Sequence, residues 1–188
     1  FRPTIDDDPV WSPDGEYVIF DSNPRGTPNI FRKRYSGAGS EEVLLAADTA
    51  AYPYDWSSDG RFILYSKPAP KGNPDIWVLP LTGDRVPFPY VNTDAGENDA
   101  KFSPNVRWVA YSSNESGKEE VYVQSFPQSG AKWQVSTSGG ASPLWRNDGK
   151  ELFYVTPSKK LMSVDVPTTG ETFEQGIPKL LFDVDVDV

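Results

Sequence analysis

The sequence predicts an all-β fold, a β-propeller made of four four-stranded antiparallel blades. Three observations predict it. A seven-residue segment recurs four times along the 188-residue chain. Three of the copies end in an Asp-Gly turn, and each copy is followed by runs rich in aromatic and β-branched residues, which favour strands. The recurring segments are residues 9–15, 54–60, 100–106 and 143–149.

The spacing of these segments sets the size of the blade. Each segment contains one aromatic anchor, and successive anchors are 45, 46 and 43 residues apart, within the ~40–50 residues of a propeller blade. We therefore predict blades over residues 5–46, 47–91, 92–136 and 137–188 of a single propeller segment. The anchors are Trp11, Trp56, Phe102 and Trp145.

Each repeat predicts four strands, the first of them at the anchor. Some of the runs, such as residues 18–20, are apolar on both faces, as expected for a sheet that is packed between two neighbouring blades. The second strands are expected at residues 17–22, 62–67, 108–113 and 152–156. The third strands are expected at residues 29–35, 75–81, 120–126 and 160–166. The fourth strands are expected at residues 42–46, 85–91, 131–136 and 179–184.

The third repeat departs from the turn pattern. It carries Asn105-Val106 where the other repeats carry Asp-Gly. Glycine accepts a positive φ without steric cost and asparagine tolerates it, whereas β-branched valine does not. We therefore expect an altered turn in the third repeat.

Residues that recur in every blade are expected to serve its architecture. The anchor aromatics are predicted to pack blade against blade, rather than to stack on a sugar or peptide. The repeated Asp14, Asp59 and Asp148 are predicted to hold their turns through side-chain hydrogen bonds, rather than to act as catalytic carboxylates. The polar residues that open three of the third strands are expected to bind a neighbouring loop; they are Asn29, Asp75 and Glu120.

Acidic residues that do not follow the repeat are the better candidates for ligand binding. Two groups lie just before the first strand of a blade, at the connection that opens toward the central channel of a propeller. Oxygen ligands of this kind would suit Ca²⁺, and their charge would suit a cationic partner; solvated loop charge is the alternative. The candidates are Asp6, Asp7, Asp8, Asp94, Glu97 and Asp99.

Composition excludes several classes of function. The chain has a net charge of −9, whereas binding to nucleic acid requires clustered Lys and Arg. It contains no His and no Cys, which excludes a Ser-His-Asp triad, a thiol nucleophile and a His-bearing zinc site. We therefore expect no catalytic residues and no required cofactor. No apolar run approaches the ~18 residues of a membrane span, so we expect no membrane insertion by this segment.

The position of the first and last residues within the repeat gives an expectation for the two ends of the chain. Residues 1–4 correspond to the end of a fourth strand, so we expect the chain to be an excerpt that begins in a preceding blade. The alternating residues 183–188 are expected to end an edge strand, where charge opposes aggregation. Open end blades expose apolar faces. We expect further blades, or a second copy that completes an eight-bladed ring; a closed four-bladed ring is the remaining alternative.

The repeat resembles that of a known family. The pattern Trp-Ser-Pro-Asp-Gly, followed by an aromatic and valine-rich strand and then Asn/Asp-Ile-Phe/Trp, resembles the TolB-like, WD-related propeller repeat over nearly the whole chain. The third and fourth repeats are also similar to the C-terminal propeller of bacterial eukaryotic-like serine/threonine kinases. That narrower resemblance is carried by residues 120–127, 132–140, 144–154, 160–166 and 173–182.

The resemblance implies a function outside catalysis. In such kinases a cytoplasmic kinase domain and a membrane span precede the propeller, so the resemblance implies an extracytoplasmic sensor that binds a protein or peptide. Related propellers fused to prolyl-oligopeptidase-type peptidases imply an alternative, a substrate-gating propeller of a peptidase or lyase; a self-assembling structural fragment is a third. This chain has no Gly-rich phosphate loop and no His for a His-Arg-Asp catalytic loop, so any such activity lies in another domain.

Overall fold

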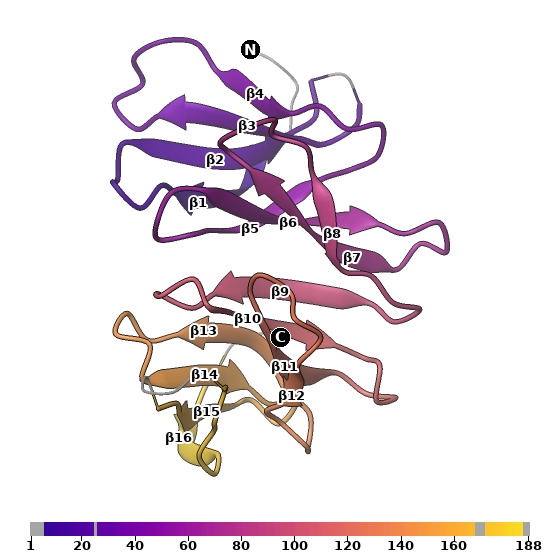
Figure 1. The fold of residues 1–188 in the computed structure, drawn as a ribbon, viewed down its shortest axis with the longest axis vertical. Coiled ribbons are helices and arrows are strands. Elements are labelled where there is room, and N and C mark those ends of the chain that lie inside the picture. Colours follow the sequence, from indigo (N-terminus) through magenta and orange to yellow (C-terminus); the bar gives the residue numbers. More distant parts are fainter. Residues whose placement is uncertain (1–5, 25, 168–171, 186–188) are drawn as a thin grey trace. The chain divides into compact units, whose positions relative to one another are not determined.

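The computed structural model describes residues 6–24, 26–167 and 172–185, and this part of the chain is all β, without a helix (Figure 1). Its strands form four separate four-stranded sheets. Each sheet lies within one of the predicted blade ranges, and its strands are paired antiparallel in sequence order. The chain divides into two compact units, Phe1–Thr93 and Asp94–Val188, with two sheets in each. The assignment of all four blades to a single propeller segment stays a prediction.

Unit 1 contains the first and second blades. The strands of the first blade are β1 (Asp6–Trp11), β2 (Tyr17–Ser22), β3 (Asn29–Arg34) and β4 (Glu42–Leu45). Those of the second blade are β5 (Tyr52–Trp56), β6 (Phe62–Pro68), β7 (Pro74–Pro80) and β8 (Phe88–Val91).

Unit 2 contains the third and fourth blades. The strands of the third blade are β9 (Glu97–Phe102), β10 (Trp108–Ser113), β11 (Glu120–Ser125) and β12 (Lys132–Gln134). Those of the fourth blade are β13 (Ala141–Trp145), β14 (Glu151–Val155), β15 (Lys160–Asp165) and β16 (Lys179–Asp183).

The second and third strands lie within one residue of their predicted bounds, and the fourth strands are shorter than predicted. In the second blade the fourth strand was expected over residues 85–91 but begins at Phe88. Arg85 has a φ of 52°, and Pro87 has no N–H to donate to a ladder. The backbone therefore cannot continue the strand toward the N-terminus.

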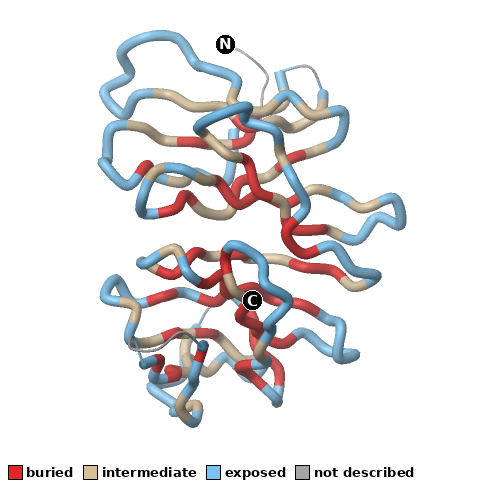
Figure 2. The backbone as a smooth tube through the Cα atoms, viewed as in Figure 1, coloured by how far each residue is buried: buried red, intermediate tan, exposed pale blue. Residues whose placement is uncertain are grey.

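Each blade has an anchor face, which carries its aromatic anchor, and an opposite face. In unit 1 the anchor face of the second blade packs on the opposite face of the first blade. Trp56, Ile63 and Tyr65 from the second blade form one cluster with Ile19 and Ile30 from the first blade. All five side chains are buried, so this contact is the core of unit 1. Figure 2 shows the buried stretches of the chain in red.

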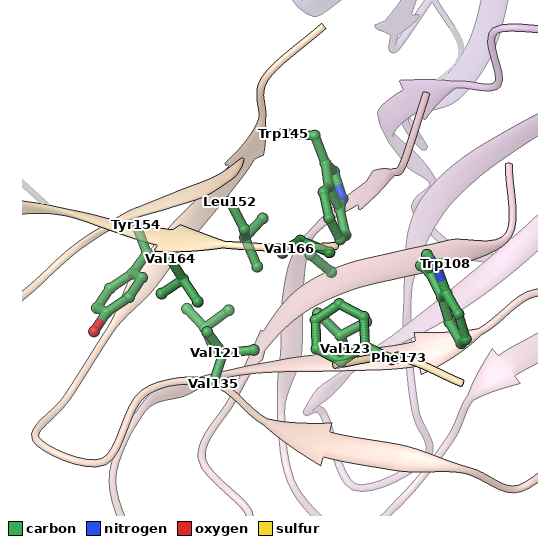
Figure 3. Close-up of a cluster of buried hydrophobic side chains, with 11 residues drawn as sticks. Trp108, Val121, Val123, Val135, Trp145, Leu152, Tyr154, Val164, Val166 and Phe173 are labelled. Carbon is green, nitrogen blue, oxygen red and sulfur yellow. The ribbon is translucent and has the colours of Figure 1, made fainter. Parts of the chain in front are cut away.

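Unit 2 repeats the arrangement. Trp145 and Leu152 on the anchor face of the fourth blade pack with Trp108, Val121 and Val123 on the opposite face of the third blade (Figure 3). The Trp145 indole Nε1 also donates to the backbone carbonyl of Lys101 in β9, at 3.1 Å. The core of each unit is therefore an anchor face packed on the opposite face of the preceding blade.

The turn of the third repeat is not altered, so this expectation was wrong. Val106 adopts a φ of 57°, and its N–H donates to the Ser103 carbonyl at 2.8 Å, as Gly15 N–H donates to the Ser12 carbonyl at 2.9 Å. Asn105 Oδ1 accepts from the Ser103 hydroxyl at 2.8 Å and from the Arg107 N–H at 3.1 Å. These hydrogen bonds hold the turn, and valine accepts the left-handed conformation.

Three of the four first strands contain a bulge with a residue at positive φ. The residues are three positions before the anchor, Asp8 (48°), Asp99 (55°) and Ser142 (52°), and the strand register shifts beside each of them. The second blade has Pro53 at this position, and a proline ring holds φ near −65°. A bulge redirects the side chain, so these positions determine where Asp8 and Asp99 point.

The two ends of the chain lie partly outside the described residues. The predicted strand end at residues 1–4 lies outside them, as does the last part of the alternating segment 183–188. The fourth strand of the last blade ends at Asp183, and all five of its residues are exposed.

Candidate binding site

In unit 1 the acidic residues at the start of β1 lie beside a buried carboxylate. Asp7 pairs directly with Asp21 of β2, and the Asp8 N–H donates to Asp7 Oδ1 at 3.1 Å. Asp21 is only 4% exposed, and its Oδ1 has no hydrogen-bond partner among the described residues. Burial, together with the charges of Asp8, Asp7 and Asp6, raises the pKa of Asp21 to about 6. This end of the first blade therefore concentrates negative charge.

In unit 2 Asp99 occupies the equivalent bulge and faces the bulge of the next blade. The Ser142 hydroxyl donates to Asp99 Oδ2 at 3.3 Å, and the Ser142 N–H donates to Ser112 Oγ at 3.2 Å. Burial, and then the charge of Asp99, raises the pKa of Glu119. The bulges of two neighbouring blades thus direct polar side chains to one place.

The positions of the other candidates differ from the prediction. Asp6, Asp7, Asp8, Glu97 and Asp99 lie within first strands and not in the loops before them, because the bulges allow polar residues to continue the ladder. Asp94 is exposed, whereas Glu97 is fully buried and is not part of a surface. Asp6–Asp8 belong to unit 1 and the other group to unit 2, so their convergence stays a prediction.

Two acidic residues near these groups were not among the candidates. Asp21 lies in a strand of mostly apolar residues, and Glu119 precedes β11. Asp21 could have been found from the sequence, because it is the one carboxylate within the otherwise mostly apolar strand β2. Within the ranges 6–24, 26–167 and 172–185, no three acidic side chains are arranged to hold a metal ion.

The anchor aromatics are buried in three of the four blades. Trp56, Phe102 and Trp145 are 6–9% exposed, whereas Trp11 is 59% exposed. Trp56 and Trp145 lie in the hydrophobic cores of their units. Trp11 shares the repeat position but not the burial.

The repeated aspartates hold turns. Asp14 Oδ1 accepts from the Ser12 hydroxyl at 2.6 Å and from the Glu16 N–H at 2.9 Å, and these bonds lower its pKa. Asp59 makes the same two kinds of bond. In the fourth repeat Arg146 replaces the serine and lowers the pKa of Asp148 to about 2. These carboxylates are thus engaged with their own turns.

The residues that open the third strands bind neighbouring loops in two of three cases. Asn29 Oδ1 accepts from the Ala47 N–H at 2.7 Å. Glu120 accepts from the Ser136 hydroxyl and from the Gly139 N–H. Asp75 is buried like Glu120, but its Oδ1 has no hydrogen-bond partner in the described part of the chain.

A hollow of about 300 Å³ lies on the β3–β4 hairpin, and its lining includes Lys33 and also Tyr17 with Arg32 and Arg34 over its ring. Each of the three cations forms an ion pair; their partners are Glu42, Glu41 and Glu16. The hollow is therefore neutral overall. No helix long and apolar enough to span a membrane occurs in the described residues.

Comparison with solved structures shows the fold. The chain superposes on TolB from Acinetobacter baumannii with a TM-score of 0.76 at 23% identity, over 99% of this chain and 45% of that one. The putative TolB from Agrobacterium tumefaciens gives 0.75 at 18% identity, over 95% and 67%. A puromycin-hydrolyzing peptidase from Mycobacterium tuberculosis gives 0.67 at 15% identity, over 97% and 31%. The chain thus spans less than half of the Acinetobacter TolB.

No protein-family model matches the sequence, and no curated protein matches it. The structural matches establish blades of the TolB-like propeller type.

Proposed function

We propose that this chain is a non-catalytic binding module that recognises a protein or peptide segment carrying Lys or Arg. The observation that carries the proposal is the acidic end of the first blade, where Asp6, Asp7 and Asp8 surround Asp21. Asp21 is a buried carboxylate with an oxygen that no described residue satisfies. A cationic side chain placed there would supply the missing partner and favour the ionised form of Asp21.

Asp99 offers a comparable acidic position within unit 2. It lies at the same bulge position as Asp8, its hydrogen-bond partner Ser142 comes from the next blade, and Glu119 is close enough to feel its charge. A carboxylate at this bulge position, with polar partners from the neighbouring strand or blade, suits the binding of one cationic side chain in each unit.

A peptide titration tests the proposal. Labelled twelve-residue peptides with Lys or Arg at varied spacing are added to the chain, and binding is followed by fluorescence anisotropy. Removing three charges with the triple variant D6N/D7N/D8N is expected to weaken binding about tenfold or more, since each exposed charge contact contributes up to about 1 kcal/mol. Replacing Lys and Arg of the peptide by Gln should have the same effect.

The triple variant D48N/D84N/E174Q is the matched control. These three acids are exposed and lie in other loops, and their replacement removes the same charge. Equal weakening by both triple variants would show general charge attraction, and failure of every peptide to bind would contradict the proposal.

As the wider setting, we propose an extracytoplasmic sensor segment of a receptor-type bacterial serine/threonine kinase. The support is the resemblance of residues 120–127 and 132–140 to the propellers of such kinases. The structural similarity to a peptidase favours a second candidate, a substrate-gating propeller. The gene distinguishes the two: an upstream kinase domain and membrane span would support the sensor, and a downstream Gly-x-Ser-x-Gly hydrolase domain would support the gate.

A further inference from the structure

The anchor face of the first blade is an exposed apolar surface. Cross-strand pairing places Trp11 beside Val18 and Phe20 beside Phe31, with Val43 next in the row. Trp11 is 59% and Val43 51% exposed. Tyr35 extends the same face, since its ring centroid lies 6.3 Å from that of Trp11. These six residues, which we call the Trp11 face, are Trp11, Val18, Phe20, Phe31, Tyr35 and Val43.

The opposite face of the fourth blade is also apolar. Leu144 pairs with Phe153, and Leu161 pairs with Phe182. Leu144 and Phe182 are each 58% exposed, and the other two are half-buried. We call these four residues, Leu144, Phe153, Leu161 and Phe182, the Leu144 face.

Both units show which kind of surface covers an anchor face. In each unit, the anchor face of one blade packs on the opposite face of the blade before it. The turns make a matching contact: a Cβ at Gly60 would lie 3.8 Å from Pro13, and one at Gly149 would lie 3.6 Å from Pro104. A Cβ at Gly15, the equivalent position of the first blade, would meet nothing within 4 Å.

We propose that the Trp11 face binds the Leu144 face of a second copy of this chain. The Trp11 face is an anchor face and the Leu144 face is an opposite face, the two kinds of surface that pack together inside each unit. Both contain side chains that are more than half exposed. In unit 2 the Trp145 indole donates to the carbonyl of Lys101, the residue just before the anchor of the preceding blade. In the proposed pair, the Trp11 indole likewise donates to the carbonyl of Leu144 in the second copy, the residue just before the anchor Trp145. The turn of its fourth blade then lies over Gly15.

The pairing is head to tail, because each copy offers a Trp11 face and receives one on its Leu144 face. Two copies satisfy both contacts at once when the assembly closes with two-fold symmetry, whereas a pairing that does not close continues into longer assemblies. Pairing of one Trp11 face with another has no counterpart in either unit. It would also place Lys33, which lies beside Val18 on this face, near its own symmetry copy.

Mass measurement with variants on each surface tests the proposal. At about 100 µM, where a dimer of micromolar affinity is almost fully formed, light scattering is expected to give twice the mass of one chain. Trp11→Glu and Leu144→Glu are each expected to lower the affinity on the order of 100-fold or more, because every copy carries the substitution and both interfaces then bury a carboxylate against an apolar face. Both residues are more than half exposed, and circular dichroism verifies that the variants fold.

Mixing the two variants separates the modes of pairing. Trp11→Glu keeps an intact Leu144 face, and Leu144→Glu keeps an intact Trp11 face. A one-to-one mixture therefore restores one native interface and is expected to dimerise, more weakly than the unmodified chain. The control Val86→Glu changes a residue that is 66% exposed in the second blade and should leave the dimer intact.

Three results would overturn the proposal. The first is an unmodified chain that is monomeric at 100 µM, and the second is a mixture of the two variants that stays monomeric. The third is a Leu144→Glu variant that is as dimeric as the unmodified chain. The last result would point to pairing of two Trp11 faces. None of these readouts involves the acidic residues of the proposed peptide site, so failure of one proposal is distinguishable from failure of the other.

Discussion

The two units differ in how they satisfy the acid that opens a third strand. Asp75 in unit 1 and Glu120 in unit 2 occupy the same place in the repeat, and both are buried. Burial raises the pKa of Asp75, and the nearby Lys67 only partly offsets this effect. Burial acts on Glu120 in the same sense, but hydrogen bonds from Ser136 and Gly139 and the charge of Lys118 hold its pKa below the usual value.

The difference lies in the loop that follows the fourth strand. In the third blade this loop returns to the start of β11, where the Gly140 N–H donates to the Glu119 carbonyl at 3.0 Å. That contact brings Ser136 and Gly139 within reach of Glu120. The first blade makes the same backbone bond from Ala51 to Pro28 at 3.0 Å, and there Asn29 is satisfied by Ala47. A buried polar residue at this position therefore stabilises the fold only when the loop supplies its partners.

The largest expected effect is the loss of Glu120. Glu120→Ala leaves the Ser136 hydroxyl and the Gly139 N–H without their acceptor, and we expect a cost of about 3 kcal/mol in the free energy of unfolding at pH 7. Because the folded pKa of Glu120 is lowered from 4.5, its contribution is present above pH 4.5 and is lost as the pH falls through the folded pKa. Urea unfolding at pH 7 and pH 3 measures both effects.

Asp75→Ala in unit 1 is the matched change. It removes a buried carboxylate that lacks a partner at one oxygen, so we expect a loss of less than about 1 kcal/mol. Equal losses for Asp75→Ala and Glu120→Ala would show that the loop contacts do not cause the difference between the units.

An intermediate effect is expected from the buried carboxylate of the proposed peptide site. The folded pKa of about 6 lies above the usual 3.8, a shift that corresponds to about 3 kcal/mol at pH 7. Burying the Asn amide offsets roughly 1 kcal/mol of this, so Asp21→Asn should stabilise the chain by about 2 kcal/mol at pH 7. In the unfolded chain this group ionises from pH 3.8 upward, which stabilises the unfolded state. In the folded chain the group stays protonated up to about pH 6. The penalty therefore develops between these two values, is constant above pH 6 and vanishes below pH 4.

Comparing Asp21→Asn with the unmodified chain at pH 4 and pH 7 isolates this ionisation. A stabilisation of the same size at both values would attribute the effect to packing and not to charge. A bound cationic peptide should also reduce the stabilisation, since it supplies the partner that the carboxylate lacks.

The smallest expected effect compares the turns of the two units. Val106→Gly in unit 2 relieves a left-handed valine, a strain of roughly 1–2 kcal/mol, but adds the entropy cost of a glycine. We expect a net stabilisation of about 0.5–1 kcal/mol. Gly15→Val in unit 1 introduces the same strain where a Cβ would meet nothing within 4 Å, and should cost about 1–2 kcal/mol. Thermal unfolding that moves both variants in the same direction would contradict this reasoning.

The third repeat shows why its turn was wrongly predicted. Local preference alone made Val106 incompatible with the turn. The structure retains the turn because Ser103 and Asn105 supply the side-chain hydrogen bonds found in the other repeats, and the strands on both sides are paired. A strain of one residue is small beside the loss of that pairing.

The candidate site was predictable in part. The unrepeated aspartates were visible because the repeat made them exceptions. Glu97 was indistinguishable from them in the sequence, yet it is fully buried. Asp21 was hidden within an apolar strand, and only its pairing with Asp7 across the β1–β2 ladder reveals it.

The sequence by itself determined the four blades and the core strands, because strand propensity, Asp-Gly turns and a regular period act over short distances. It also determined that no His- or Cys-based chemistry is available in this chain. Only the tertiary structure decided which copies of the repeated motif are buried and which are exposed. Trp11 and Trp145 share one repeat position, but Trp145 packs against a preceding blade and Trp11 is exposed. Burial and hydrogen-bond partners come from residues distant in the chain, and a local pattern does not encode them.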